Sequence, residues 1–294
     1  MRLAVTGGTG LVGRFIVEAA LRAGVRVTVL SRTTSAIFSA PVDQPGYSLG
    51  EAPNLNGIDA LVHCAFCHLP GRYRGGEGHD PDGFVRVNLD GSLRLFEAAR
   101  SSGVGRVIFL SSRAVYGSYP PGTELEETLP PRPDTLYGEV KWWTEQALTA
   151  MTVPGFTALN LRATGVYGPA GPGRQHKWAA LFADYLAGHP IAARCGTELH
   201  GDDLAAAVMR ILETPPDELN GPLNASDIVL DRHDLLALVA EKTGCPHPLP
   251  PRAETPVSVM RTRRLRQLGW QPGGLARLRA SLPALLKPGS GSES

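Results

Sequence analysis

The stretch that decides the fold is Thr6-Gly7-Gly8-Thr9-Gly10-Leu11-Val12-Gly13, or TGGTGLVG at residues 6–13. It follows a strand-like run at 3–6 and precedes residues 11–23, where apolar side chains recur with the 3.6-residue period of a helix. Glycines at this spacing allow a tight turn, close backbone approach to a pyrophosphate and tight packing of helix on strand. The sequence therefore predicts a dinucleotide-binding loop that opens a βαβ unit. The expected cofactor contacts in it are Gly7, Thr9, Gly10, Leu11, Val12 and Gly13.

Outward from this loop, strand-like and helical patterns alternate, as in a parallel sheet covered on both faces. Strands are expected at 25–30, 59–66, 106–112 and 156–161, and helices at about 82–100, 136–151, 176–187, 203–213, 232–243 and 274–286. The predicted fold class is α/β, a Rossmann-type doubly wound parallel sheet with a smaller interwoven C-terminal substrate lobe.

The pattern loosens after residue 165, which suggests how the chain is divided. Residues 1–165 and about 198–226 are expected to form the dinucleotide-binding domain. Residues 166–197 and 227–286 are expected to form the substrate-binding lobe, and the small, polar residues 287–294 a disordered tail.

Composition excludes several classes of protein. The chain has 294 residues, of which 43% are hydrophobic and 19% charged, and its formal net charge is +1. This is typical of a globular protein, and no basic surplus points to nucleic acid or to an anionic membrane. The first residues lack the layout of a signal peptide, and four cysteines make no disulfide framework, so we expect a cytoplasmic protein.

The end of the second expected strand bears on the choice of dinucleotide. An acidic residue there would accept a hydrogen bond from the ribose 2′-hydroxyl of NAD, but no acid occurs between Glu18 and Asp43. The segment instead contains Ser31 and Arg32, and a guanidinium can bind a 2′-phosphate through two charge-assisted bonds. NADP is therefore favoured, with NAD as the alternative.

A tyrosine and a lysine lie four residues apart at Tyr137 and Lys141, on one face of an expected helix. A free phenol is a poor base at neutral pH and needs a nearby positive charge, which Lys141 can supply. Ser112 ends the strand at 106–112, where open α/β sheets place their ligands. We expect Ser112 to hold the reacting oxygen of the substrate while Tyr137 moves the proton.

With these residues the chain resembles the extended short-chain dehydrogenase/reductase superfamily, in its NAD-dependent epimerase/dehydratase branch. The resemblance covers roughly residues 1–270 and rests on TGGTGLVG (6–13), DALVHCA (59–65), NLDGSLRLFEAA (88–99), FLSSRAVYG (109–117), YGEVK (137–141), LRATGVYGP (161–169), HGDDLAAAV (200–208) and LRQLGWQP (265–272). It implies a catalytic triad of Ser112, Tyr137 and Lys141, with Asn88 supporting the active-site helix. It also implies a C-terminal lobe that binds the substrate, commonly a nucleotide sugar.

Departures from the family pattern concern the substrate. Family dehydratases carry an acid pair where Arg113 and Ala114 stand, so a 4,6-dehydratase is not expected. Gly165 replaces the family's asparagine, the segment 188–203 is short, and Leu199 stands near the place of a diphosphate-binding arginine. These changes leave room for a smaller sugar or a sugar acid. Arg113 could bind a carboxylate or phosphate, or could instead buttress the neighbouring loop.

Two other stretches invite a functional interpretation. His63 to His68 contains two histidines and two cysteines, but a strand points alternate side chains apart, so no metal site is expected and the segment is interpreted as a wall of the nicotinamide pocket. The basic run at 260–266 fits a solvated helix face, or contact with an anionic substrate. Further expected cofactor contacts are Cys64, Ala65 and Lys141, and expected substrate contacts are Cys67, His68, Arg113 and Thr164.

The predicted function is that of an NAD(P)-dependent sugar-modifying enzyme that oxidises a substrate hydroxyl, as a nucleotide-sugar epimerase does. One alternative is an NADP-dependent dehydrogenase or reductase of a small sugar or sugar acid. An alternative of another class is a non-catalytic dinucleotide sensor. The expected partner is a small-molecule substrate, and assembly as a homodimer stays open.

Overall fold

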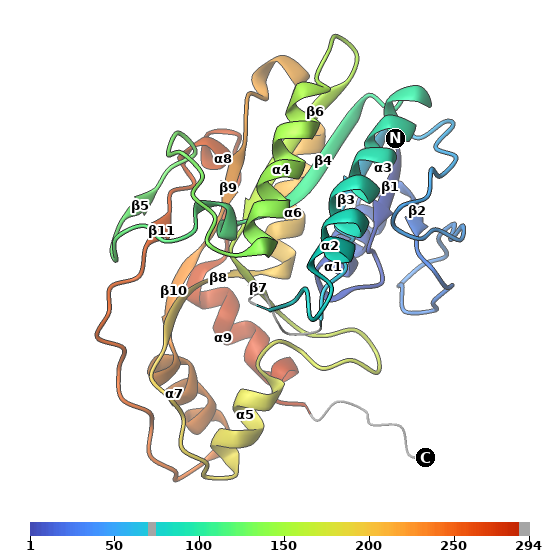
Figure 1. Cartoon of the computed structure of the whole chain (residues 1–294). Coiled ribbons are helices and arrows are strands. Elements are labelled where there is room, and N and C mark those ends of the chain that lie inside the picture. The colour runs from blue at the N-terminus through green and yellow to red at the C-terminus, as the bar shows by residue number, and fades with distance from the viewer. Residues whose placement is uncertain (70–74, 288–294) are drawn as a thin grey trace.

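The computed structural model describes residues 1–69 and 75–287. In this part of the chain a parallel sheet of six strands has the order β2-β1-β3-β4-β6-β9 (Figure 1). Its strands are β1 (Arg2–Thr6), β2 (Arg26–Leu30), β3 (Ala60–His63), β4 (Arg106–Ser112), β6 (Thr157–Ala163) and β9 (Leu223–Ala225). The chain leaves β1 toward β2 on one side and later returns to β3 on the other. Ligands of such sheets bind at the carboxyl ends of the strands beside this switch point.

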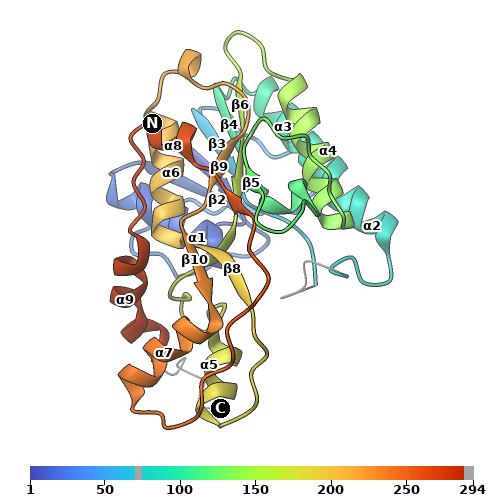
Figure 2. The same ribbon diagram turned by 90° about the vertical axis from the view of Figure 1, so that its left-hand side faces the viewer.

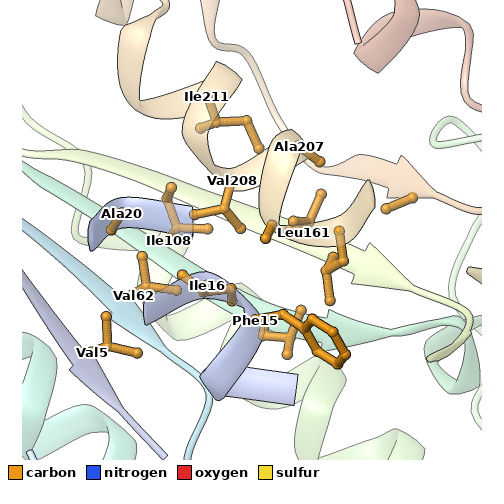
Figure 3. Packing of buried hydrophobic residues seen from close by; sticks show 14 of the residues in the cluster. Val5, Phe15, Ile16, Ala20, Val62, Ile108, Leu161, Ala207, Val208 and Ile211 are labelled. Carbon is orange, nitrogen blue, oxygen red and sulfur yellow. The ribbon is translucent and has the colours of Figure 1, made fainter. Parts of the chain in front are cut away.

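Helices cover both faces of the sheet (Figure 2). One face carries α1 (Leu11–Arg22) and α6 (Gly201–Glu213), and the other carries α3 (Gly91–Ser101) and α4 (Leu136–Ala150). Strand side chains alternate between the two layers, so Ile108 packs with the first pair of helices and Phe109 with the second. Figure 3 shows the first of these cores, where Phe15 and Ile16 of α1 meet Val208 of α6 over the sheet.

A smaller sheet and three helices form the opposite end of the molecule (Figures 1 and 2). The sheet has the order β10-β8-β7, with β8 antiparallel to β10 and parallel to β7. Its elements and the helices packed on it are β7 (Gly165–Tyr167), β8 (Cys195–His200), β10 (Ile228–Asp231), α5 (Ala179–Leu186), α7 (Arg232–Thr243) and α9 (Gly274–Leu285). Shorter elements are α2 (Pro81–Val85), β5 (Glu124–Leu125), β11 (Val259–Met260) and α8 (Arg263–Gln267), and 3-10 turns at Arg113–Tyr116 and Pro216–Glu218.

The predicted Rossmann-type sheet is confirmed, with local differences. The helix expected at 82–100 is interrupted by a π-helical turn at Arg86–Asp90, between α2 and α3. The strand expected at 59–66 ends at His63, and β6 continues to Ala163. The predicted division into lobes stays a prediction, and of the predicted disordered tail, residues 288–294 lie outside the described part of the chain.

Candidate active site

The segment after β4 packs against the start of α4, and these two places carry Ser112 and Tyr137. Ser112 is the last residue of β4, and its hydroxyl accepts a hydrogen bond from the Ala114 amide at 3.1 Å. Helix α4 begins after the N-cap Thr135, whose side chain accepts from the Gly138 amide. Gly138 packs closely on Ala114, since a Cβ at 138 would lie 2.6 Å from the Ala114 carbonyl oxygen. Tyr137 is therefore held beside the end of β4, and it is 9% exposed.

Lys141 lies one turn further along α4 and is buried. Its Nζ donates to the Leu110 carbonyl at 2.7 Å and lies 4.3 Å from the centre of the Phe66 ring, 4.5 Å from that of Phe109 and 5.9 Å from that of Tyr137. Burial lowers the pKa of Lys141 to about 7, although the charge of nearby Glu145 opposes this shift. The ammonium is thus placed to act on the phenol and changes its charge near neutral pH.

Asn88 lies in the π-helical turn and is fully buried. Its Oδ1 accepts from the Cys67 amide at 2.7 Å, and its Nδ2 donates to the carbonyls of Cys67 at 2.8 Å and Phe84 at 2.9 Å. These hydrogen bonds fix the segment after β3 rather than α4. The segment in turn contacts Tyr137, with ring centres 5.1 Å apart for Phe66 and 6.5 Å apart for His68.

The glycine loop has the shape that a dinucleotide requires. Gly7 has a positive φ of 66°, and a Cβ there would lie 2.8 Å from the Ala65 amide nitrogen. A Cβ on Gly13 would lie 2.3 Å from the Gly7 carbonyl oxygen. Gly10 begins α1 without a side-chain cap, so the first amides of the helix can meet an anion. These residues fit a pyrophosphate on the loop, with Cys64 and Ala65 alongside.

Ser31 and Arg32 directly follow β2. The Ser31 hydroxyl donates to the Thr33 carbonyl at 2.8 Å, and Arg32 is exposed. The residues after them run beside β2 without a helix, bound by isolated bridges such as the one between Ser31 and Gly46.

Arg113 lines a cavity of about 860 Å³ whose walls come from the segment after β4, the start of α4, residues 193–195 and residues 251–258. Tyr137 lines the same cavity, as do Arg194 before β8 and Ser258 in the long connection before β11. The guanidinium donates to the Ser258 carbonyl at 3.2 Å, while Nε is buried without a hydrogen-bond partner among the described residues. Burial lowers the pKa of Arg113, and Asp134 opposes this shift. Both interpretations of Arg113, buttress and substrate contact, therefore have a structural basis.

Thr164 and Gly165 contact residues of β8 and Lys177. The Thr164 hydroxyl donates to the Thr197 carbonyl at 2.9 Å. A Cβ at Gly165 would lie 2.4 Å from Lys177 Nζ and 3.0 Å from a carboxylate oxygen of Glu198. Lys177 and Glu198 form an ion pair. The space next to Gly165 is thus taken by a lysine that the motif comparison did not identify.

A buried ion pair also escaped the sequence analysis. Arg162 of β6 and Glu145 of α4 are both 2% exposed and meet at 2.7 Å. Arg162 also donates to the Tyr116 hydroxyl at 3.0 Å, and Tyr116 donates to Asn224 of β9 at 2.9 Å. Two signals could have identified the pair: a charge inside an apolar strand, and an acid four residues after Lys141 on the same helix face.

The arginines of the basic run at 260–266 bind neighbouring segments of the protein. In the basic run, Arg261 pairs with Glu124, Arg263 pairs with Glu126, and Arg264 donates to the Pro222 carbonyl. Across residues 1–69 and 75–287, no group of three or more His, Cys, Asp or Glu side chains is placed to hold a metal ion. No helix in these ranges is long and apolar enough to cross a membrane.

Comparison with known proteins identifies the family. The NAD dependent epimerase/dehydratase family matches residues 3–225, which is most of the chain. The chain belongs to this family. The predicted resemblance and the prediction of a nicotinamide-dinucleotide-dependent enzyme of this family are thereby confirmed.

The relatives that match this chain include epimerases and a dehydratase. The UDP-glucose 4-epimerase of Corynebacterium glutamicum is 26% identical in an alignment of 304 positions, gaps included, which covers 92% of this chain and 91% of the relative. The dTDP-glucose 4,6-dehydratase of Streptomyces niveus is 33% identical over 57% of this chain and 55% of the relative. Among solved structures, the UDP-glucose 4-epimerase of Thermus thermophilus with NAD has a TM-score of 0.77 at 28% identity, covering 98% and 99% of the two chains.

Proposed function

We propose that this family member is an NAD(P)-dependent sugar-modifying enzyme that oxidises a hydroxyl of its substrate, in the manner of a nucleotide-sugar epimerase. The observation that supports this best is that Lys141 lies beside the Tyr137 ring and binds the Leu110 carbonyl of β4, the strand that ends at Ser112. The alternative of a non-catalytic dinucleotide sensor fits less well, because a sensor needs no such group of side chains.

In this proposal the Ser112 hydroxyl holds the substrate oxygen and Tyr137 takes its proton. Lys141 stabilises the phenolate by its charge, from a position where the Leu110 carbonyl fixes its ammonium. A bound nicotinamide dinucleotide supplies the hydride acceptor, and later the donor if the ketone is reduced again. Reduction on the other face of the ketone gives an epimerase, and release of the ketone gives a dehydrogenase.

We further propose NADP as the preferred dinucleotide, with NAD as the alternative. The support is the exposed Arg32 directly after β2, where NAD enzymes carry an acid. The Thermus thermophilus epimerase was solved with NAD, so the two dinucleotides must be compared directly on this protein.

A second candidate is a dehydrogenase or reductase of a sugar acid, and Arg113 is the observation that favours it. Arg113 and Arg194 line one cavity with Tyr137, so an anionic group of the substrate would meet two guanidiniums there. If Arg113 binds such a group, Arg113→Ala raises KM for an acidic substrate far more than for its neutral analogue and leaves dinucleotide affinity intact. An equal change for both substrates assigns Arg113 to the support of the 251–258 segment.

The test is a panel of nucleotide sugars, free sugars and sugar acids, assayed with NAD and with NADP. A net change in nicotinamide absorbance identifies a dehydrogenase or reductase. An isomeric product without such a change identifies an epimerase. A protein that binds dinucleotide but converts nothing in the panel, with Tyr137→Phe indistinguishable from wild type, supports the sensor instead.

A further inference from the structure

A chain of buried hydrogen bonds runs through His63, which the proposed chemistry does not use. Thr6, the last residue of β1, accepts from the Ala65 amide at 3.1 Å, and its Oγ1 lies 2.6 Å from His63 Nδ1. His63 Nε2 lies 2.9 Å from Ser92 Oγ, and the Ser92 hydroxyl donates to the Asn88 carbonyl. Thr6, His63 and Asn88 are fully buried, so no water replaces these bonds.

The number of available protons fixes which group donates in each of these hydrogen bonds. Ser92 has one hydroxyl proton and gives it to the Asn88 carbonyl, so from His63 it can only accept. The proton of the imidazole is therefore on Nε2, and the bare Nδ1 accepts from the Thr6 hydroxyl. Every group is satisfied only when His63 is neutral and in the Nε2–H form.

The surroundings of the ring favour the same state. His63 stacks on Phe109 with ring centres 5.6 Å apart, and Lys141 of α4 holds its ammonium 4.5 Å from the centre of the same Phe109 ring. Phe96 of α3 packs edge-on at 5.5 Å. Burial, and to a smaller extent Lys141, lower the pKa of His63 to about 3. The neighbouring Cys64 thiol brings no compensating negative charge, because burial raises its pKa to about 12.

Both ends of this series of hydrogen bonds, Thr6 and Asn88, lie at the walls of the expected dinucleotide groove. Thr6 directly precedes Gly7, whose backbone touches Ala65 so closely that a Cβ would lie 2.9 Å from the Ala65 Cα. At the other end, Asn88 binds both the amide and the carbonyl of Cys67. The series of hydrogen bonds thus joins the glycine loop to the segment in which Phe66 contacts Tyr137.

We propose that His63 is a positioning residue for the dinucleotide, which as a neutral Nε2–H imidazole holds the glycine loop and residues 64–67 together as one preformed groove. His63 acts through Thr6 and through Ser92 and Asn88, and touches neither substrate nor cofactor. A preformed groove binds more tightly because less ordering is required on binding. The inference rests on the proposed function only in requiring that a nicotinamide dinucleotide binds here.

The hydrogen-bond chain itself is tested by ¹H–¹⁵N correlation spectra of the full-length protein with labelled histidine. The His63 signals are assigned by their loss in His63→Asn. We expect a protonated Nε2 and a bare Nδ1 that stay unchanged from pH 8 to pH 5. A proton on Nδ1, or titration with an ordinary histidine pKa in this range, overturns the proposal.

The consequence for binding is tested by calorimetry with NAD and NADP. His63→Leu removes both hydrogen bonds but keeps an apolar side chain, and should weaken binding of the preferred dinucleotide about tenfold. His63→Asn, which can reach Thr6 but not Ser92, should lose about threefold. The control Phe96→Leu removes packing from the same ring without breaking the chain, and should stay within twofold.

All variants are measured below their unfolding temperatures. Equal losses in His63→Leu and Phe96→Leu, in proportion to their loss of stability, reduce His63 to a packing residue and overturn the proposal. The same conclusion follows if His63→Leu binds like wild type. Failure of the wild-type protein to bind either dinucleotide instead overturns the proposed function, and with it the role of His63, whereas the spectra still report the state of the ring.

Discussion

In the proposed reaction Tyr137 and Lys141, on neighbouring turns of α4, have two different tasks, and this separation can be tested at single atoms. In this reaction the Tyr137 hydroxyl carries a proton, whereas the ring packs against Phe66 and His68, and Tyr137→Phe keeps the ring. Tyr137→Phe should therefore lower kcat by about 10²- to 10⁴-fold and leave dinucleotide affinity nearly unchanged. Steady-state assays with the substrate found in the panel give kcat, and calorimetry with the dinucleotide gives its affinity.

The matched control for this loss is Tyr185→Phe. It removes a hydroxyl that donates to the His247 carbonyl in the smaller lobe, far along the chain from α4. This variant should retain turnover. If Tyr137→Phe keeps activity within tenfold of wild type, Tyr137 is not the acid and base.

Arg32 decides the dinucleotide in the proposal because it is exposed at the carboxyl end of β2. Arg32→Asp removes the cation that would bind a 2′-phosphate and adds an acceptor for a ribose hydroxyl. We expect NADP affinity to fall by about 1.5–3 kcal/mol, roughly tenfold to a hundredfold, while NAD affinity rises or stays constant.

Arg26→Asp provides the control, since it makes the same charge change at the opposite end of the same strand. Calorimetric titration of both variants with both dinucleotides separates a local contact from a general charge effect. A wild-type protein that already prefers NAD would contradict the argument from Arg32 and leave Ser31 to serve the ribose.

At the scale of elements, the sequence predicts whatever is encoded by local periodicity. Strand β4 is a continuous apolar run and α1 an apolar stripe after a glycine turn, and both appear as predicted. The π-helical turn around Asn88 has no such signal, because its extra residue is stabilised by bonds to Cys67, 21 positions away. The three-residue strands β7 and β9 likewise depend on partners distant in sequence.

The candidate site follows the same rule. The places of Ser112 at a strand end and of Tyr137 and Lys141 on one helix could be predicted, because each depends on its own strand or helix, whereas their catalytic roles stay a prediction. Contacts between elements could not: the Thr164 hydroxyl, expected at the substrate, bonds to Thr197, and the space beside Gly165 is filled from residue 177. Such contacts become visible only when distant segments are brought together.

Gly165 makes this coupling measurable. A Cβ there approaches Lys177 Nζ to 2.4 Å and a Glu198 carboxylate oxygen to 3.0 Å, so the ends of two flexible side chains must adjust. Gly165→Ala should therefore cost about 1 kcal/mol of unfolding free energy, because Lys177 is displaced from Glu198 in an ion pair that is partly exposed. In a Lys177→Met background this cost should shrink. Denaturant unfolding of the four proteins of the double-mutant cycle gives the coupling, and additive effects would contradict the steric account.

At the scale of the whole molecule, buried polar links join the layers. Glu145 and Arg162 tie α4 to β6, and Tyr116 extends the link to Asn224 of β9. The same face of α4 carries Tyr137, Lys141 and Glu145, so the Glu145–Arg162 pair anchors the face of the proposed catalytic residues to the sheet. Lys141 itself has no such carboxylate partner in bonding distance among its described contacts, and its charge is held by a carbonyl and aromatic rings.

The uncompensated burial of Lys141 predicts how stability changes with pH. The ordinary lysine pKa is 10.5, and burial lowers that of Lys141 to about 7 in the folded protein. Between these values the unfolded chain binds a proton that the folded protein has lost, so the contribution of Lys141 raises stability as pH rises. From pH 7 to pH 9 this contribution grows by on the order of 2 kcal/mol.

Lys141→Met isolates this contribution, because it removes the titrating group and leaves the other ionisable side chains in place. We expect the unfolding free energy of wild type to rise relative to the variant between pH 7 and pH 9, in the absence of dinucleotide. Lys242→Met on the exposed end of α7 is the control and should run parallel to wild type. Staying at or below pH 9 keeps the contribution of the Cys64 thiol small, because that contribution develops between its ordinary pKa of 9.0 and the value of about 12 to which burial raises it. Parallel curves for wild type and Lys141→Met would mean that the Lys141 ammonium keeps its proton in the folded protein, and that the charge proposed to act on Tyr137 is permanent.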